Sequence, residues 1–206
     1  MKYLKYFKTD VDRQNYFSSD KFVTPNVSYA EGSDTIYFKP YTDDLIIMTS
    51  ESNPEVMKVC YNQRWAASSD KMYASEAAKV TSIGTAFESL GNGGSDSGYS
   101  GSNISFTFSF NEFKYFTGVT SIVDGAFQES NIDSITIPDS VTSIGDYAFG
   151  NCSKLKEITC LATTAPSIWG TTFTGLNSYG TLKIPAGSDY SSWKNSLGFR
   201  WTTQEI

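Results

Sequence analysis

The sequence predicts a β-rich α+β protein, in which a small N-terminal β module and a helical segment precede a short solenoid with a C-terminal cap. The first observation is an internal repeat. Residues 119–127 (VTSIVDGAF) return 22 positions later at 141–149 (VTSIGDYAF), and a shorter copy (VTSIGTAF) stands at 80–87. The second is a strand-like alternation of apolar residues after the later copies. Self-similarity at this period is typical of a solenoid, in which each unit buries its apolar face against its neighbours.

Short strands are predicted within residues 1–50. Residues 3–7 alternate between apolar and polar side chains, 36–38 are β-prone, and 45–48 form a short apolar run. Stretches rich in Pro, Gly, Asn and Asp separate these runs and predict turns. We therefore expect a small β module over residues 1–50.

A helical segment is predicted over residues 51–90. The Asn-Pro-Glu sequence at 53–55 supplies an N-cap residue, a first-turn proline and a first-turn acid, and apolar residues then recur on one helix face. A second short helix is predicted at 76–79. Residues 91–103 are rich in Gly and Ser and predict an exposed loop, either as a spacer or as a binding loop that carries Tyr99.

The repeats are predicted to occupy residues 104–160. The apolar pattern I-x-x-I-x-I that begins at Ile132 recurs 23 residues later as L-x-x-I-x-C beginning at Leu155. Side chains two positions apart lie on the same face of a strand, so these residues should face the core. Including the C-terminal unit, parallel strands are expected near 135–137, 158–160 and 182–184.

The predicted core consists of the apolar residues that recur from repeat to repeat: Ile122, Phe127, Ile135, Ile137, Ile144, Phe149, Leu155 and Ile158. Residues 161–206 depart from the pattern and are rich in Trp and polar residues. A solenoid needs a terminal unit to cover its last open coil, so this stretch is predicted to be the cap.

Composition excludes several classes of function. The net charge is −6 and there is no basic run, which argues against nucleic-acid binding. Histidine is absent, which removes His-based nucleophile systems, His general bases and His metal ligands. The three cysteines, an odd number without a CxxC, predict small buried hydrophobes. Asp and Glu number 22, yet nothing in the sequence places a pair for glycan hydrolysis. We therefore expect no catalytic residues, no cofactor and no bound metal.

The repeat pattern V-T-S-I-G-x-x-A-F-x-x-C-x-x-L-x-x-I resembles the leucine-rich repeats of the BspA type over roughly residues 104–160. The C-terminal stretch, with TLKIPAGS at 181–188 followed by Tyr190, Trp193 and Trp201, is similar to the last unit of such proteins. The resemblance implies a surface adhesin that binds host proteins or glycans.

A second resemblance concerns the N-terminus. The sequence KYLKYF at 2–7, Tyr16 and the sequence PNVSY at 25–29 resemble the start of structural proteins from phages and prophages of Bacteroidota. This implies an attachment module, and its aromatic residues are the candidate contacts: Tyr3, Tyr6, Phe7, Tyr16, Phe17 and Tyr29.

A third resemblance links the segment before the repeats to an EF-hand. With Glu76 as the twelfth position of the loop, positions 1, 3 and 5 are Trp65, Ala67 and Ser69, and position 6 is Asp70. An EF-hand needs oxygen ligands at 1, 3 and 5 and a glycine at 6. Trp and Ala cannot coordinate, so we expect a degenerate loop that keeps its shape without calcium, with Trp65 filling the space by packing.

These patterns favour a non-enzymatic virion protein, a fibre, tail or head decoration component that displays its solenoid to a host surface or to a neighbouring virion protein. Its expected partners are other virion proteins, a second copy of the chain, and a host glycan or protein. The start of the sequence lacks the apolar stretch of a secretion signal and no segment is long enough to span a membrane, which fits assembly in a host cytoplasm. The alternative is a BspA-type adhesin on a bacterial surface.

Overall fold

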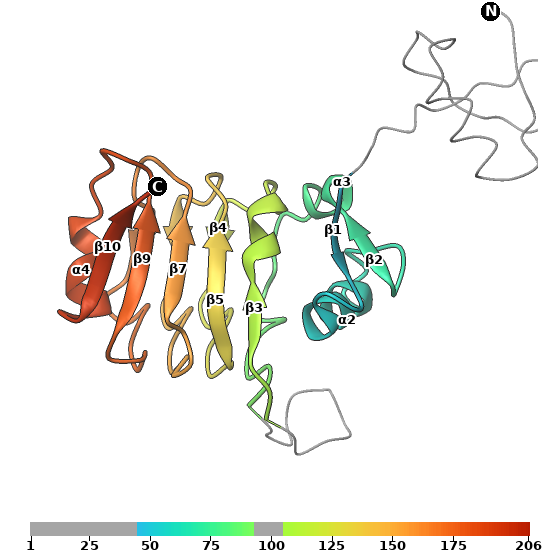
Figure 1. Ribbon diagram of the computed structural model, residues 1–206, viewed down its shortest axis with the longest axis horizontal. Coiled ribbons are helices and arrows are strands. Elements are labelled where there is room, and N and C mark those ends of the chain that lie inside the picture. Colours follow the sequence, from blue (N-terminus) through green and yellow to red (C-terminus); the bar gives the residue numbers. More distant parts are fainter. Residues whose placement is uncertain (1–44, 93–104) are drawn as a thin grey trace, which may run out of the picture. The chain divides into compact units, whose positions relative to one another are not determined.

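The protein is described from a computed structural model that places residues 45–92 and 105–206 (Figure 1). The predicted strands at 3–7 and 36–38, the six attachment aromatics and Tyr99 lie outside the described residues. The described part contains four helical elements, two parallel sheets and one two-stranded sheet.

The larger sheet has five parallel strands, which lie side by side from β3 in green to β10 in red in Figure 1. In spatial order they are β3 (Phe108–Phe110), β5 (Ile132–Ile137), β7 (Glu157–Cys160), β9 (Gly180–Ile184) and β10 (Trp201–Glu205). The parallel strands predicted near 135–137, 158–160 and 182–184 are confirmed in β5, β7 and β9. Their register pairs Ile135 with Ile158 and Ile158 with Leu182, so equivalent apolar side chains stack in the core.

The smaller sheet has three parallel strands of two residues each: β4 (Ser121–Ile122), β6 (Ser143–Ile144) and β8 (Ser167–Ile168). Its register aligns the three Ser-Ile pairs. The chain visits the larger sheet, then the smaller one, and then returns to the larger sheet one strand further along. This alternation of parallel strands is consistent with leucine-rich-repeat architecture.

A column of aromatic rings runs through the core between the sheets. Successive ring centroids are 5.2 Å apart for Phe87 and Phe127, 5.1 Å for Phe127 and Phe149, and 5.6 Å for Phe149 and Phe173. Trp193 continues the column 5.2 Å beyond Phe173. Each of these five side chains is buried. Aromatic pairs in such contact contribute about 0.5–1.5 kcal/mol beyond the burial of their area.

The repeat continues beyond residue 160, where the sequence analysis places the start of the cap. Ser167 and Phe173 are each 24 residues after their equivalents, Ser143 and Phe149, and they occupy the same places in the sheet and in the aromatic column. This coil is two residues longer than the 22-residue period, so a search at that period does not find it. After this coil, α4 (Ser191–Leu197) and β10 cover the end of the repeats, with Trp193 of α4 packed on Phe173.

The first coil is longer than the others, because Phe87 and Phe127 are 40 residues apart. It contains the Gly/Ser-rich segment and a 3₁₀ helix, η1 (Asn111–Tyr115). Asn131 ties the two ends of the Gly/Ser-rich segment together, since its side-chain amide donates to the Gly91 carbonyl at 2.7 Å and to Ser105 Oγ at 2.8 Å. The ends of this insertion are therefore held by the repeats themselves.

The residues before the repeats form a small unit of two strands and two helices. Strand β1 (Ile46–Thr49) pairs antiparallel with β2 (Lys71–Tyr73), and the helices are α2 (Pro54–Asn62) and α3 (Ala74–Ala77). The first helix begins at the predicted proline, whereas the second begins two residues before the predicted one. Strand β1 pairs across the boundary predicted at residue 50, because its partner residues on β2 lie 22 to 27 positions further along the chain and not in the N-terminal module.

The predicted capping role of Asn53 is wrong. Asn53 occupies the N-cap position of α2, but its side chain makes no capping hydrogen bond. Its amide instead donates to the Ser109 carbonyl at 2.8 Å and to Glu112 Oε2 at 3.2 Å. The first coil also approaches residues 78–80 closely at Gly118. A Cβ at Gly118 would lie 2.6 Å from the carbonyl oxygens of Ala78 and Val80. Asn53 therefore joins the helical unit to the first coil.

Candidate functional site

The eight predicted core residues form the scaffold of the repeats and do not reach the surface. Each is at most 1% exposed: Ile122, Phe127, Ile135, Ile137, Ile144, Phe149, Leu155 and Ile158. A contact surface among the described residues must therefore use side chains other than these eight.

The loop that resembles an EF-hand is closed by hydrogen bonds from its own backbone. Glu76 Oε1 accepts from the Ala67 N–H at 2.9 Å, and Oε2 accepts from the Tyr73 N–H at 2.8 Å. Trp65, at the first position of the loop, packs against Phe87 and Phe116 with centroid distances of 6.2 and 6.1 Å. Both oxygens of the bidentate position are engaged, and the side chains at positions 1 and 3 have no oxygen. The donor set thus does not fit a calcium ion.

Two further features bear on the kind of site. The part of the chain that the structure describes holds no group of three or more Cys, Asp or Glu side chains arranged to bind a metal ion. None of the helices in that part is long and apolar enough to cross a bilayer.

All three cysteines are free and buried. Burial raises the pKa of the Cys152 thiol to about 12 and also raises the pKa of Cys60 and Cys160. Cys152 Sγ donates to the Phe127 carbonyl at 2.9 Å. Because the thiolate is the reactive form, these side chains act as core residues at neutral pH.

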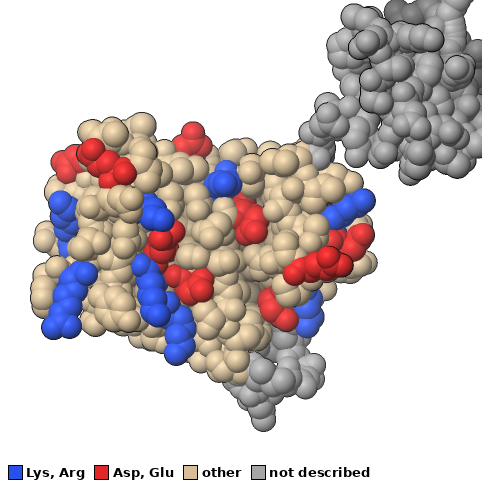
Figure 2. Space-filling view, in the orientation of Figure 1, with Lys and Arg blue, Asp and Glu red and all other residues tan. Residues whose placement is uncertain are grey.

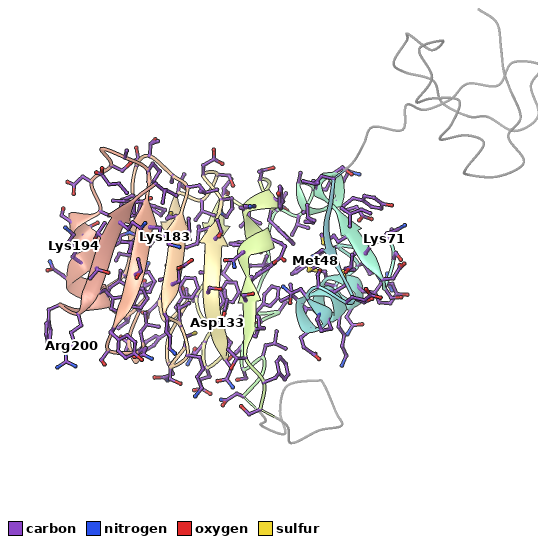
Figure 3. The ribbon with its side chains drawn as sticks, viewed as in Figure 1. Met48, Lys71, Asp133, Lys183, Lys194 and Arg200 are labelled. Carbon is purple, nitrogen blue, oxygen red and sulfur yellow. The ribbon has the colours of Figure 1, made fainter. Side chains whose placement is uncertain are left out.

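The face of the five-stranded sheet carries acidic and basic side chains interspersed, as Figure 2 shows. Glu157 on β7 and Lys183 on β9 form an ion pair of 2.7 Å. Asp133 and Lys183 lie on strands of this sheet, whereas Lys194 and Arg200 lie beside its C-terminal end in Figure 3. Charges of both signs are mixed on this face, so it does not define a site for a ligand of one charge.

A different surface carries exposed apolar side chains at the smaller sheet. Val123 and Trp169 directly follow β4 and β8, and Tyr147 lies three residues after β6; they are 36%, 67% and 39% exposed. We call these three residues the Trp169 patch. Parallel register aligns β4, β6 and β8, and neighbouring strands are about 4.8 Å apart, so Val123 and Trp169 lie at the same end of this sheet, and Tyr147 lies in the turn after its central strand.

Gly145 shapes the middle of the patch. It is the equivalent of Val123 and Trp169 in the central coil, and it carries no side chain. A Cβ at Gly145 would collide with the Asp124 carboxylate, whose Oδ1 accepts from the Asp146 N–H at 2.7 Å. The Asp124 carboxylate therefore occupies the space that a side chain at Gly145 would fill, between the coils that carry Val123 and Trp169.

Tyr147 has an unusual backbone for a bulky residue. Its φ is +49°, in the left-handed region, whereas the equivalent residue of the preceding repeat is Gly125 with φ +66°. This offers a signal that sequence reasoning missed: at this position one repeat has glycine and the next has an aromatic residue. The aligned repeats alone would not show that the side chain is exposed.

The fold and this patch define a repeat protein that exposes apolar side chains outside its core. Residues 102–196 match the model of the BspA type leucine rich repeat region, in six copies. This part of the chain is thus similar to BspA-type repeats, and a role in binding or adhesion follows from that similarity. No match was found among curated proteins or among solved structures.

Proposed function

We propose that this protein is a non-enzymatic recognition protein, whose repeats form a solenoid that presents the Trp169 patch to a partner. Tyr147 is the observation that carries this proposal. A left-handed backbone at a non-glycine residue costs of order 1–3 kcal/mol, and strain of this kind concentrates at functional positions. The side chain is 39% exposed, so core packing does not account for an aromatic residue at this position.

The chemistry of the patch suits a surface partner. Trp and Tyr provide large contact areas with few rotatable bonds, and they are the residues most enriched among energetic centres of interfaces. Asp124 and the hydroxyl groups of neighbouring Ser and Thr residues add acceptors and donors beside the rings. A host cell-surface glycan or protein is the kind of partner that this combination fits.

We further propose that the protein is a structural component of a phage virion, attached through residues 1–50 to other virion proteins or to a second copy of itself. The resemblance of residues 2–7 and 25–29 to phage structural proteins supports this setting. The alternative is a bacterial surface adhesin that uses the same patch. Neighbouring capsid, portal and tail genes would favour the virion, whereas a leader sequence encoded upstream would favour the adhesin.

Binding of the labelled full chain to a glycan array and to intact bacterial cells tests the recognition role. Trp169→Ala and Tyr147→Gly should each weaken binding by about tenfold or more, the range expected for aromatic centres of interfaces. The matched control is Phe199→Ala, an aromatic residue that is 92% exposed but lies outside the patch. If Trp169→Ala and Tyr147→Gly bound as tightly as the Phe199→Ala control and the unsubstituted protein, the Trp169 patch would be ruled out as the contact surface.

A further inference from the structure

A second surface feature lies where the unit of β1, β2, α2 and α3, at the right of Figure 1, leads into the first repeat copy at 80–87. There a pocket of about 440 Å³ opens beside the loop that follows α2. Its lining includes Arg64, Trp65, Glu76, Lys79, Thr81 and Ser82. Pockets that hold small ligands usually have volumes of about 300–1,000 Å³, so this one has room for a ligand of the size of a monosaccharide.

The pocket has an excess of positive charge. Arg64 and Lys79 are both exposed, and neither forms an ion pair with any residue that the structure describes. Glu76 is the carboxylate in the lining, but both its oxygens already accept hydrogen bonds from the Ala67 and Tyr73 backbone. Two cationic side chains are therefore available to a ligand, and the carboxylate beside them is engaged elsewhere.

Arg64 is held in a backbone conformation that favours glycine. Its φ is +60°, and it directly follows the C-cap of α2. The Trp65 N–H donates back to the Cys60 carbonyl at 2.9 Å, which is the hydrogen bond that closes a helix at a left-handed residue. Glycine is the usual residue at such a position, so the long guanidinium side chain is kept here against a local preference.

The remaining walls supply the other contacts that a sugar needs. Trp65 is half-buried, with its ring packed on Phe87 and Phe116, which holds the indole in place. Thr81 and Ser82 bring hydroxyl groups, and the Ser82 Oγ accepts from the Gly84 N–H at 3.2 Å, which leaves its own hydrogen free to donate. A fixed aromatic wall, two hydroxyl groups and two cations thus surround one volume.

We propose that this pocket binds an acidic sugar, that is, a monosaccharide unit bearing a carboxylate. The carboxylate would pair with Arg64, whose planar fork matches its geometry, and with Lys79. The apolar face of the ring would lie on Trp65, and sugar hydroxyls would meet Thr81 and Ser82. The site shares no residue with the Trp169 patch, so it goes beyond the recognition role of that patch.

Titration of the full chain by ligand-observed NMR tests the pocket, with glucuronic acid and N-acetylneuraminic acid as probes and with glucose and inorganic sulfate as comparisons. At least one acidic sugar should bind about tenfold or more tightly than either comparison, a ratio within reach of one charge-assisted hydrogen bond. Added salt should weaken this binding, because the cations are exposed. Equal binding of glucose, or binding of sulfate as tight as that of the acidic sugars, would overturn the proposal.

Two variants assign the binding to this pocket. Arg64→Gly removes the guanidinium while it relieves the left-handed backbone, so folding should be preserved, and affinity for the acidic sugar should fall about tenfold. Lys79→Gln should also lower the affinity, whereas Lys154→Gln removes an exposed lysine elsewhere and should change nothing. Trp169→Ala should also leave it unchanged, which separates this site from the Trp169 patch. Unchanged affinity in Arg64→Gly would place the sugar elsewhere and refute the assignment.

Discussion

The rings of Phe127 and Phe149 lie 5.1 Å apart and within 2° of parallel. The two residues are 22 positions apart in the sequence, the period of the repeat, so each coil places its aromatic ring directly on that of the next. With Phe87, Phe173 and Trp193 at either end, the column extends from the first repeat copy to α4. The stability of each coil therefore depends on its neighbours.

Truncation in the middle of this column should be costly. Phe149→Ala should lower the free energy of unfolding by about 3–5 kcal/mol, because the ring is fully buried and loses contacts on both faces. Denaturant titration measures this loss. Phe199→Ala, at an exposed aromatic residue, should stay within about 0.5 kcal/mol of the unsubstituted protein. A loss under about 1 kcal/mol for Phe149→Ala would be incompatible with a stacked core.

Asn53 should contribute to stability through the first coil rather than through its helix. Asn53→Ala leaves the Ser109 carbonyl and the Glu112 carboxylate without their donor, and we expect a loss of about 1–3 kcal/mol by thermal or chemical unfolding. Asn53→Ser would restore a good N-cap residue without the reach to β3, and it should not recover the loss. Recovery by serine would show that capping is the relevant contact.

The buried thiols should make stability depend on alkaline pH. Because the pKa of Cys152 is raised from its ordinary value of 9.0 to about 12 on folding, the native state keeps its proton while the unfolded chain loses it. Stability from this group is full below pH 9 and declines as pH rises from 9 toward 12. Cys152→Ala should flatten that decline in a series of denaturant titrations. A thiol reagent at pH 8 should label the native protein slowly and the denatured protein at all three cysteines.

Calcium should not bind to the loop at 65–76. Isothermal titration should detect no site tighter than about 10⁻⁴ M, since two of the required ligand positions lack oxygen. Glu76→Ala should nevertheless destabilise the protein by about 1–3 kcal/mol, because it leaves the Ala67 and Tyr73 N–H groups without an acceptor. A calcium-dependent rise in the melting temperature that Glu76→Ala abolishes would contradict this interpretation of the loop.

Attachment should reside in the N-terminal residues, and the deletion that tests it should end at residue 44. Strand β1 pairs with β2, so a deletion through residue 50 would remove part of a sheet. Residues 45–206 form a compact unit, which should stay folded by circular dichroism. Light scattering after size exclusion, together with a particle pull-down, should show that the truncated chain has lost oligomerisation or incorporation. Normal assembly of the truncated chain would favour the adhesin alternative.

Much of the repeat region can be predicted from the sequence, because local periodicity and core burial agree there. The 22-residue period places Phe127 beside Phe149, and the alternation of Ile135 and Ile137 identifies one buried face of a strand. The coil that contains Phe173 is missed, because two extra residues change its spacing while the sheet register absorbs them. Register is set by hydrogen bonds between coils, which a search for identical strings does not detect.

The sequence by itself determined the parallel strands, the buried core positions and the poor fit of the 65–76 loop to calcium, because each depends on residue type at a regular or known spacing. Only the tertiary structure decided which distant side chains lie near one another. Asn53 changes from a cap to a bridge because β3 lies within its reach, and Arg64 and Lys79 line one pocket although 15 residues separate them. Trp169 and Tyr147 follow neighbouring strands of the smaller sheet, although 22 residues separate them in the sequence. These juxtapositions arise when coils stack, and local sequence does not encode them.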